Sequence, residues 1–325
     1  MVSPTHPDWF TALEAGVSRD MVHSSEFVVQ FWGVRGSIAT PGLSTVRYGG
    51  NTSCVEMRVG GKRLIFDGGT GLRVLGQHLL SQGQIEAHMF FSHSHWDHIQ
   101  GFPFFRPAFI PGNRFHIYGG IAPNGATMKQ RLSDQMLHPN FPVPMQIMQS
   151  EMHFHDVQAG QVIDLGDGVI VEMGALNHPN TAMGYRVTWR GYSAVYATDT
   201  EHYSDHLDEN LLHLCRNADV LVYDACYTDE EYHDPKTSKK GWGHSTWQEA
   251  LQLSQAAKVR YPVMFHHDPD HDDEFLDRIE AQVKAVAPNS CLAREGLVVS
   301  VVSGADYGLR EREVSERTPS SVAAG

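Results

Sequence analysis

The sequence lacks several features that mark particular classes of protein. It contains no run of 18 or more apolar residues, which excludes a membrane-spanning helix of ordinary length. Its first residues carry His6, Asp8 and Glu14 and lack the basic-then-apolar pattern of a secretory signal peptide. The four cysteines are scattered and include no C-x-x-C pair, so we interpret them as reduced packing residues. We therefore expect a cytoplasmic protein without a membrane partner.

Extended basic segments are also missing. The net charge is −13 with histidine neutral, and the pair Lys239-Lys240 is too small to offset that field. A negative field repels long polyanions, so a nucleic-acid partner is not expected. The composition, 41% hydrophobic and 19% charged, is that of an ordinary globular protein. A length of 325 residues allows one large domain or two small ones, and both a monomer and a homo-oligomer remain open.

One short segment is dense in potential metal ligands. Residues 93–98 read His-Ser-His-Trp-Asp-His, which places His93, His95, Asp97 and His98 close together. The apolar residues before them predict a buried strand, and in extended chain residues i and i+2 point to the same side. His93 and His95 can therefore share one cation, while Asp97 and His98 follow at a turn and can face a second. Imidazole and carboxylate ligands suit Zn²⁺, with Mn²⁺ and Fe²⁺ as alternatives, whereas a histidine-rich surface turn is disfavoured by the specific spacing.

The remaining chain alternates short strands and helices, without a repeat or a dividing linker. Strands are predicted at 27–32, 53–59, 63–66, 85–91, 115–118, 162–164, 169–175, 184–189, 193–197, 220–223, 262–265 and 296–302. Helices are predicted at 72–80, 205–216, 246–257 and 275–286, with Ser245 able to cap the third.

This pattern divides the chain into three parts. Residues 1–26 are a polar lead-in, 27–303 form one domain, and 304–325 are a tail that is partly disordered. Within the domain, 102–150 are rich in aromatic residues, proline and methionine and have few clear elements. Such a stretch is either a lid or binding loop, or a capping insert that packs on the core.

Three further potential ligands stand directly after predicted strands. They are His178, Asp199 and His266. Strand-rich halves with ligand loops at strand ends suggest a layered αββα sandwich of the α/β class, in which such loops meet. Each residue alone would more often be structural. Together with the 93–98 segment they supply the number of ligands that a centre of two metal ions needs.

From residue 27 to 303 the sequence resembles the metallo-β-lactamase fold superfamily. The 93–98 segment, the three later ligands and the turn Asp67-Gly68-Gly69 fall in the order of that family. The resemblance implies two divalent metal ions, the first held by His93, His95 and His178. It assigns the second to Asp97, His98 and His266, with Asp199 bridging both. His267 remains an alternative to its neighbour His266.

Two more segments resemble the transfer-RNA 3′-end processing endonuclease branch and its small-molecule phosphodiesterase relatives. One is Gly-His-Ser-Thr at 243–246, before a predicted helix, and the other is the predicted strand region 218–225. In that branch a histidine of the first pairs with an acidic residue of the second and helps to protonate the leaving group. The resemblance assigns these roles to His244 and Asp224. No glycine- and proline-rich basic arm, with which that branch grips transfer RNA, is visible.

We therefore expect a dinuclear metal-dependent hydrolase of a small phosphodiester such as a cyclic nucleotide. Two cations about 3.5–4 Å apart can share a hydroxide that attacks phosphorus in line. Asp97 is expected to be a ligand that also accepts a proton, and His244, oriented by Asp224, to be the proton donor. Arg35, at a glycine turn, either holds a phosphate through two hydrogen bonds or forms a structural ion pair.

Other functions remain open. The same metals would polarise a carbonyl in a lactonase, thioesterase or β-lactamase, and cleavage would then need less help from His244. RNA 3′-end cleavage is a weaker alternative because of the acidic charge. A di-iron redox protein of this fold would require a flavin-binding partner segment, which is not visible. A metal-bound module without catalysis is disfavoured by the intact ligand set.

Overall fold

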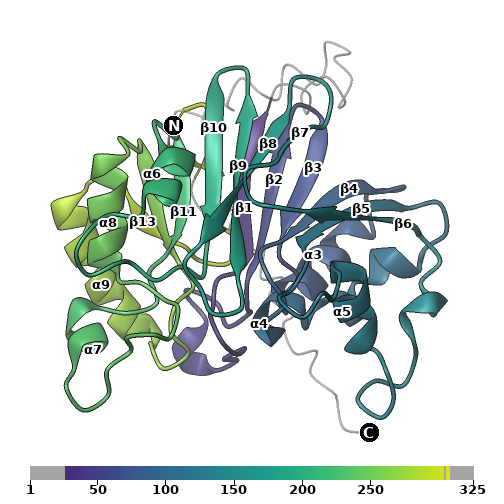
Figure 1. Ribbon diagram of the computed structural model, residues 1–325, viewed down its shortest axis with the longest axis horizontal. Helices are drawn as coiled ribbons and strands as arrows, with labels where there is room; N and C mark the ends of the chain where they lie inside the picture. Colours follow the sequence, from purple (N-terminus) through teal and green to yellow (C-terminus); the bar gives the residue numbers. More distant parts are fainter. Residues whose placement is uncertain (1–25, 304, 308–325) are drawn as a thin grey trace, which may run out of the picture.

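Two packed β-sheets with helices on both outer faces form the protein, as the computed structural model of residues 26–303 and 305–307 shows (Figure 1). This arrangement confirms the expected αββα sandwich of the α/β class. The predicted lead-in up to residue 25 and the tail beyond residue 307, for which partial disorder was predicted, lie outside the described residues. Within them, no helix has the length and apolar character needed to cross a membrane.

The strands of the first sheet lie mostly in the N-terminal half of the chain. They are β1 (Phe27–Gly33), β2 (Cys54–Val59), β3 (Lys62–Phe66), β4 (Glu86–Phe91), β5 (Arg114–Gly120), β6 (Glu151–Val157), β14 (Val298–Ser300) and β15 (Ala305–Tyr307). Their order in the sheet is β15-β14-β1-β2-β3-β4-β5-β6, and the strands from β3 to β6 run parallel.

The second sheet collects the later strands. They are β7 (Val162–Asp164), β8 (Ile170–Leu176), β9 (Ala182–Trp189), β10 (Tyr192–Ala197), β11 (Val220–Asp224), β12 (Tyr261–Phe265) and β13 (Cys291–Leu292), in the order β13-β12-β11-β10-β9-β8-β7. The strands from β10 to β13 are parallel. Every residue of β11 and β12 is buried, as expected for strands covered on both faces.

Helices complete the two outer layers. They are α3 (Gly71–Leu79), α4 (Trp96–Ile99), α5 (Met128–Asp134), α6 (Glu209–Cys215), α7 (Asp229–His233), α8 (Trp247–Ala256) and α9 (Asp273–Val286). Helices α6, α8 and α9 pack on the second sheet, and α3 and α5 pack on the first (Figure 1). Helix α8 begins one residue later than expected, because its cap is Thr246, whose hydroxyl accepts from the backbone of Glu249, and not Ser245.

Segment 102–150 packs on the core and contains an interior strand, β5. Four of its methionines, Met128, Met136, Met145 and Met148, are buried with the side chains beneath α3. These contacts show how the segment packs, and the choice between a binding loop and a capping insert stays a prediction. The four cysteines are buried and form no disulfide, in keeping with a packing role.

The loop that follows β4 is pressed tightly against the turn that follows β3. The backbone N–H of Gly101 donates to the carbonyl of Gly68, and a side chain at Gly101 would place its Cβ 1.9 Å from the carbonyl oxygen of Gly69. The backbone of Gly101 is itself ordinary right-handed helical, with φ −78°. Only the close approach, and no backbone strain, requires glycine here.

Replacing Gly101 by alanine should therefore destabilise the protein by about 1–3 kcal/mol, because the two turns must separate to admit the methyl group. Chemical denaturation would measure the free energy of unfolding. Gly42→Ala is the control, since its nearest neighbour would be 3.9 Å away. Equal stability of the two variants would contradict this explanation.

Candidate metal centre

The predicted ligands meet at the ends of strands in both sheets. His93 and His95 follow β4, and Asp97 and His98 lie in the short helix α4 directly after them. His178 follows β8, Asp199 follows β10 and His266 follows β12. Parallel strands present their carboxyl ends at one edge of a sheet, and so these residues, far apart in sequence, converge.

Three imidazoles form the first group. His93, His95 and His178 each present a nitrogen, and these three atoms lie within 4.8 Å of one another. Nε2 of His178 faces Nδ1 of His95 at 3.2 Å. Nε2 of His93 is buried without a hydrogen-bond partner. A cation would satisfy all three nitrogen atoms.

Two carboxylates and two imidazoles form the second group. Ligand atoms of Asp97, His98, Asp199 and His266 lie within 4.8 Å of one another. Nε2 of His98 and Nε2 of His266 are 3.3 Å apart, and Oδ2 of Asp97 is 3.1 Å from the former and 3.2 Å from the latter. Mixed imidazole and carboxylate donors of this kind suit Zn²⁺, Mn²⁺ or Fe²⁺.

The carboxylate of Asp199 lies between the two groups. Its Oδ1 is 3.8 Å from Nε2 of both His93 and His178. Its Oδ2 is 3.1 Å from Nε2 of His98 and 3.2 Å from Nε2 of His266. Each oxygen therefore faces a different group, which is the placement that a residue bridging two cations requires.

Burial keeps the first group neutral. Removal from water lowers the pKa of His93, His95 and His178, although the charge of Asp199 acts in the opposite direction on each. Neutral imidazole retains the lone pair that binds a metal.

The second group is instead dominated by negative charge. Burial opposes ionisation of Asp97, but His98 and His266 outweigh it and lower the pKa of that carboxyl. Burial likewise disfavours a charged His98, yet Asp199, Asp97 and Asp67 raise its pKa. This corner of the site consequently favours positive charge, which a divalent cation would supply.

The carboxylate of Asp67 orients ligands of both groups. It accepts from Nδ1–H of His98 at 2.8 Å, from the Tyr196 hydroxyl at 2.7 Å and from the backbone and hydroxyl of Ser92, both at 2.7 Å. Because the Ser92 hydroxyl donates to Asp67, its oxygen is left to accept from Nδ1–H of His93 at 3.0 Å. The Nε2 atoms of both imidazoles are thereby directed at the centre.

His178 is oriented by backbone rather than by a carboxylate. Its Nδ1–H donates to the carbonyl of Gly243 at 2.8 Å, which leaves Nε2 for a metal. Glu201 fixes the loop that carries this carbonyl, because it accepts from the backbone N–H groups of Gly241 and Gly243 at 2.7 and 2.8 Å. Gly243 has φ +85° and a Cβ there would lie 2.3 Å from Nδ1 of His178, so glycine is required.

His244 and Asp224 form the pair that the resemblance implied. Nδ1–H of His244 donates to Oδ2 of Asp224 at 2.8 Å. The backbone groups of Cys226 and Ser245 hold Oδ1 of the same carboxylate. Burial lowers the pKa of His244, but Asp224 and the more distant Asp199 outweigh it and raise that pKa to about 9.

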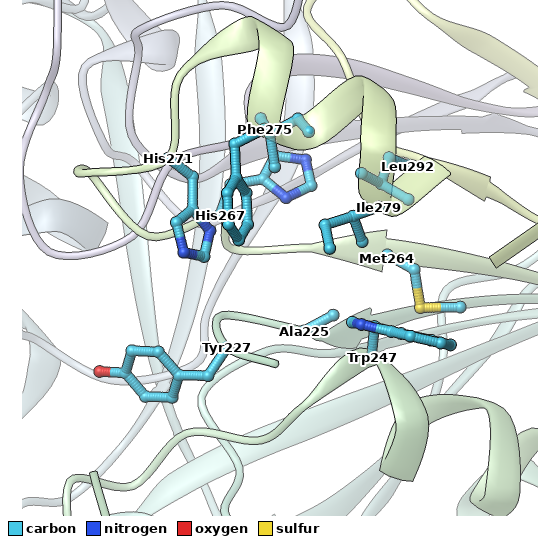
Figure 2. Close-up of a pocket in the computed structure, with 10 residues that line it drawn as sticks. Ala225, Tyr227, Trp247, Met264, His267, His271, Phe275, Ile279 and Leu292 are labelled. Atoms are coloured by element: carbon cyan, nitrogen blue, oxygen red, sulfur yellow. The ribbon is translucent and has the colours of Figure 1, made fainter. Parts of the chain in front are cut away.

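His267 points away from the centre. Its Nε2–H donates to the carbonyl of Ala293 at 2.8 Å, and burial together with the charge of Arg35 lowers its pKa to about 3. Figure 2 shows it beside His271 and Phe275, in a small apolar pocket lined further by Met264, Ile279 and Leu292. Of the two neighbouring histidines, the structure thus places His266 and not His267 among the ligand atoms.

Of the two roles predicted for Arg35, the contact with a phosphate is wrong. The side chain is 0% exposed, and its guanidinium donates to the carbonyls of Gly49, Asp268 and His271. The side chain of Arg35 therefore holds together the loops that contain these three carbonyl groups. The turn that follows Arg35 leaves space for the ring of His266, because a Cβ at Gly36 would lie 2.5 Å from Nδ1 of His266.

A cavity of about 430 Å³ opens over the two groups. It is lined by Ser37, Ser94, His95, Trp96, Asp97, Asp199 and His244. Trp96 is 81% exposed at this cavity. The volume lies in the range of small-molecule sites.

Sequence reasoning assigned no role to several residues that the centre uses. The sequence pattern places Asp67 only in a turn, and it assigns no role to Tyr196, Ser92 or Glu201. The sequence feature that could have identified Asp67 is the motif Asp-Gly-Gly directly after a buried strand. The carbonyl of Gly243 could not be found in this way, because every residue has one.

Comparison with known proteins identifies the family. Residues 62–267, more than half of the chain, match the family model described as the Beta-lactamase superfamily domain, and the chain therefore belongs to that superfamily, a family of hydrolytic enzymes.

Relatives at low identity are ribonucleases. Ribonuclease BN of Citrobacter koseri is 26% identical over 148 residues, which cover 46% of this chain and 43% of that protein. Ribonuclease Z of Gemmatimonas aurantiaca is 28% identical over 145 residues, or 45% of this chain and 40% of that protein. The match thus spans less than half the length of either relative.

Solved structures share the fold at lower identity. The metallo-beta-lactamase fold protein YhfI from Bacillus subtilis has a TM-score of 0.62 and 18% identity, covering 85% of this chain and 100% of that one. A diphosphatase from the PhnP family has a TM-score of 0.61 and 21% identity, with 84% and 97% covered. The short form of human tRNase Z has a TM-score of 0.58 and 20% identity, with 84% and 99% covered.

Replacing Asp67 by asparagine should weaken metal binding about 10–100-fold, because the amide cannot orient His98 and Ser92 as the carboxylate does. Competition with a chromogenic chelator would measure the affinity, and circular dichroism would verify that the variant is folded. Asp205→Asn is the control, since this exposed carboxylate bonds only to His206 among the described residues. Equal metal affinity of the two variants would contradict the role assigned to Asp67.

Proposed function

We propose that the chain is a dinuclear metal-dependent phosphodiesterase that acts on a small phosphodiester such as a cyclic nucleotide. The observation that carries the proposal is the hydrogen bond from His244, which lines the cavity beside the ligand groups, to the buried Asp224. A phosphodiester with an alkoxide leaving group needs a proton donor more than an ester, lactone or β-lactam does. The ribonucleases among the relatives and the diphosphatase among the structural neighbours agree with phosphorus chemistry.

The metal ions would be divalent, with zinc as the first choice. His93, His95 and His178 would hold one, and Asp97, His98 and His266 the other, with Asp199 between them. When bound, they would supply a water activated for attack on phosphorus and would neutralise charge on the non-bridging oxygens. Asp97 also accepts the backbone N–H of Ser37 at 2.8 Å, which holds its carboxylate where it could accept a proton from the attacking water.

His244 is proposed to protonate the leaving group. Asp224 accepts its Nδ1–H, so the ring is held with Nε2 as the atom available to the substrate. The leaving alkoxide takes the Nε2 proton as the bond from phosphorus to that oxygen breaks. The carboxylate of Asp224 stabilises the imidazolium that precedes this transfer.

The cavity and the surface charge favour a small substrate over RNA. A volume of about 430 Å³ accommodates a nucleotide-sized molecule, and the exposed indole of Trp96 offers a face on which a base can stack. The net charge of −13 disfavours a long polyanion. The remaining candidate, a hydrolase of carboxylic esters, lactones or β-lactams, would use the same metal ligands but would depend little on His244.

His244→Ala should lower kcat for a cyclic nucleotide by about 10²–10⁴-fold, because the alkoxide would have to leave unprotonated. For bis(p-nitrophenyl) phosphate the loss should be clearly smaller, since p-nitrophenolate is a good leaving group. Apo protein reloaded with Zn²⁺ or Mn²⁺ would be assayed on both diesters, on a panel of cyclic nucleotides, on a lactone and on a β-lactam.

His213→Ala provides the control, because this side chain is exposed, pairs with Glu172 and belongs to neither ligand group. Wild-type turnover of the lactone or β-lactam but of no diester would overturn the proposal. An equal loss on both diesters would show that His244 only supports the structure of the site.

A further inference from the structure

A second cavity adjoins the first at the metal-ligand loop. Its volume is about 310 Å³, and it shares Ser94 and His95 with the cavity over the centre. Its outer wall is formed by Ala122, Pro123, Asn124, Arg131 and Asn180. Most of these residues lie between β5 and the end of α5, so the segment that packs on the core also lines a space beside the centre. A substrate centred at His95 can therefore extend into two separate cavities.

The guanidinium of Arg131 is held at this wall by neutral acceptors. Its Nη1 donates to the hydroxyl of Ser94 at 2.9 Å, its Nη2 to the carbonyl of Gly120 and its Nε to the carbonyl of Thr127 at 3.4 Å. The contact with Ser94 brings the positive charge next to the His93–His95 stretch. A fixed guanidinium of this kind retains N–H groups for a ligand and loses little freedom on binding.

Among the described residues no ion pair includes Arg131, and the carboxylate whose charge acts on it is that of Asp156. The side chain is half-buried, and burial lowers its pKa more than the charges of Tyr185 and Asp156 raise it. A partly buried charge that lacks a direct ion pair is costly, and an anion in the cavity would reduce that cost. Arginine recognises phosphate well, because its planar N–H groups match two phosphate oxygens.

We propose that the second cavity is a subsite for an anionic group, in which Arg131 binds a second phosphate of the substrate while the scissile diester lies at the centre. This inference rests on the proposed phosphodiesterase function and narrows its substrate class. The favoured substrates are small phosphodiesters that carry a further phosphate, and a diester with only neutral substituents leaves the subsite unused.

A matched pair of ligands tests binding without turnover. Thymidine 3′,5′-bisphosphate and thymidine 5′-phosphate differ by one phosphate, and calorimetric titration of metal-loaded protein would give both dissociation constants. Wild-type protein should bind the bisphosphate at least about tenfold more tightly, as expected for one charge-assisted phosphate contact. Arg131→Met should reduce this preference to about twofold or less.

Two further variants separate a local contact from a general change of charge. Asn124→Asp places a negative charge in the same cavity, and its Oδ1 can still accept from the backbone of Ala126, so the local structure is kept. Lys129→Met removes a positive charge from an exposed position of the same helix, beside the ring of Phe154. All three variants change the net charge by one unit in the same direction, yet only Arg131→Met and Asn124→Asp should abolish the preference.

The subsite is refuted if Arg131→Met and Asn124→Asp keep the wild-type preference, or if Lys129→Met loses it to the same extent. Should Arg131→Met fail to fold, Asn124→Asp decides. Hydrolysis of thymidine 5′-(p-nitrophenyl phosphate) with and without a 3′-phosphate separates this result from the proposed function. If neither ester is cleaved but the binding preference depends on Arg131, the function fails and the subsite stands. If both are cleaved with the same KM before and after the change at Arg131, the subsite fails and the function stands.

Discussion

A single buried carboxylate, that of Asp67, determines how the two sheets and the metal-ligand loop fit together. It lies directly after β3 of the first sheet and accepts a hydrogen bond from Tyr196 on β10 of the second sheet. It also holds His98 directly and His93 through the hydroxyl of Ser92. A buried carboxylate left without these donors would be costly. The same four hydrogen bonds therefore stabilise the sandwich and fix which nitrogen of each imidazole faces the centre.

The backbone conformation at the centre lowers local stability. Asp67, Asp199 and His266 each follow a strand with φ between 57° and 63°, a left-handed conformation that side chains disfavour. A strained backbone of this kind costs about 1–3 kcal/mol per residue. The left-handed conformation turns the chain sharply at each strand end. These turns bring the three side chains to one edge of the sandwich. Gly36 and Gly243 make room for the imidazoles that result.

Local sequence patterns were enough to predict the fold class and to select the residues that converge at the centre. Their success has a physical reason, because a ligand placed directly after a strand is carried to the sheet edge by the fold itself. Strand β6 was missed because its few apolar residues, Met152, Phe154 and Val157, stand among histidine and acidic residues, and it pairs only with β5. Arg35 was misplaced because a glycine turn does not reveal which side of it faces the interior. The Gly243 carbonyl could not be predicted from side-chain patterns at all.

Chemistry and specificity have different structural sources in this protein. Apart from the exposed His95, the side chains that would hold metal ions are largely buried and stand at strand ends, several of them fixed by hydrogen bonds. The cavity walls come instead from Trp96 on α4 and from residues 122–131, which include exposed positions between β5 and α5. Such positions accept substitution at little cost in stability, whereas a change at Asp67 or Asp199 disturbs several buried groups at once. Relatives that share the ligand set can therefore differ in substrate through these walls alone, and for this reason the family does not by itself specify what this chain hydrolyses.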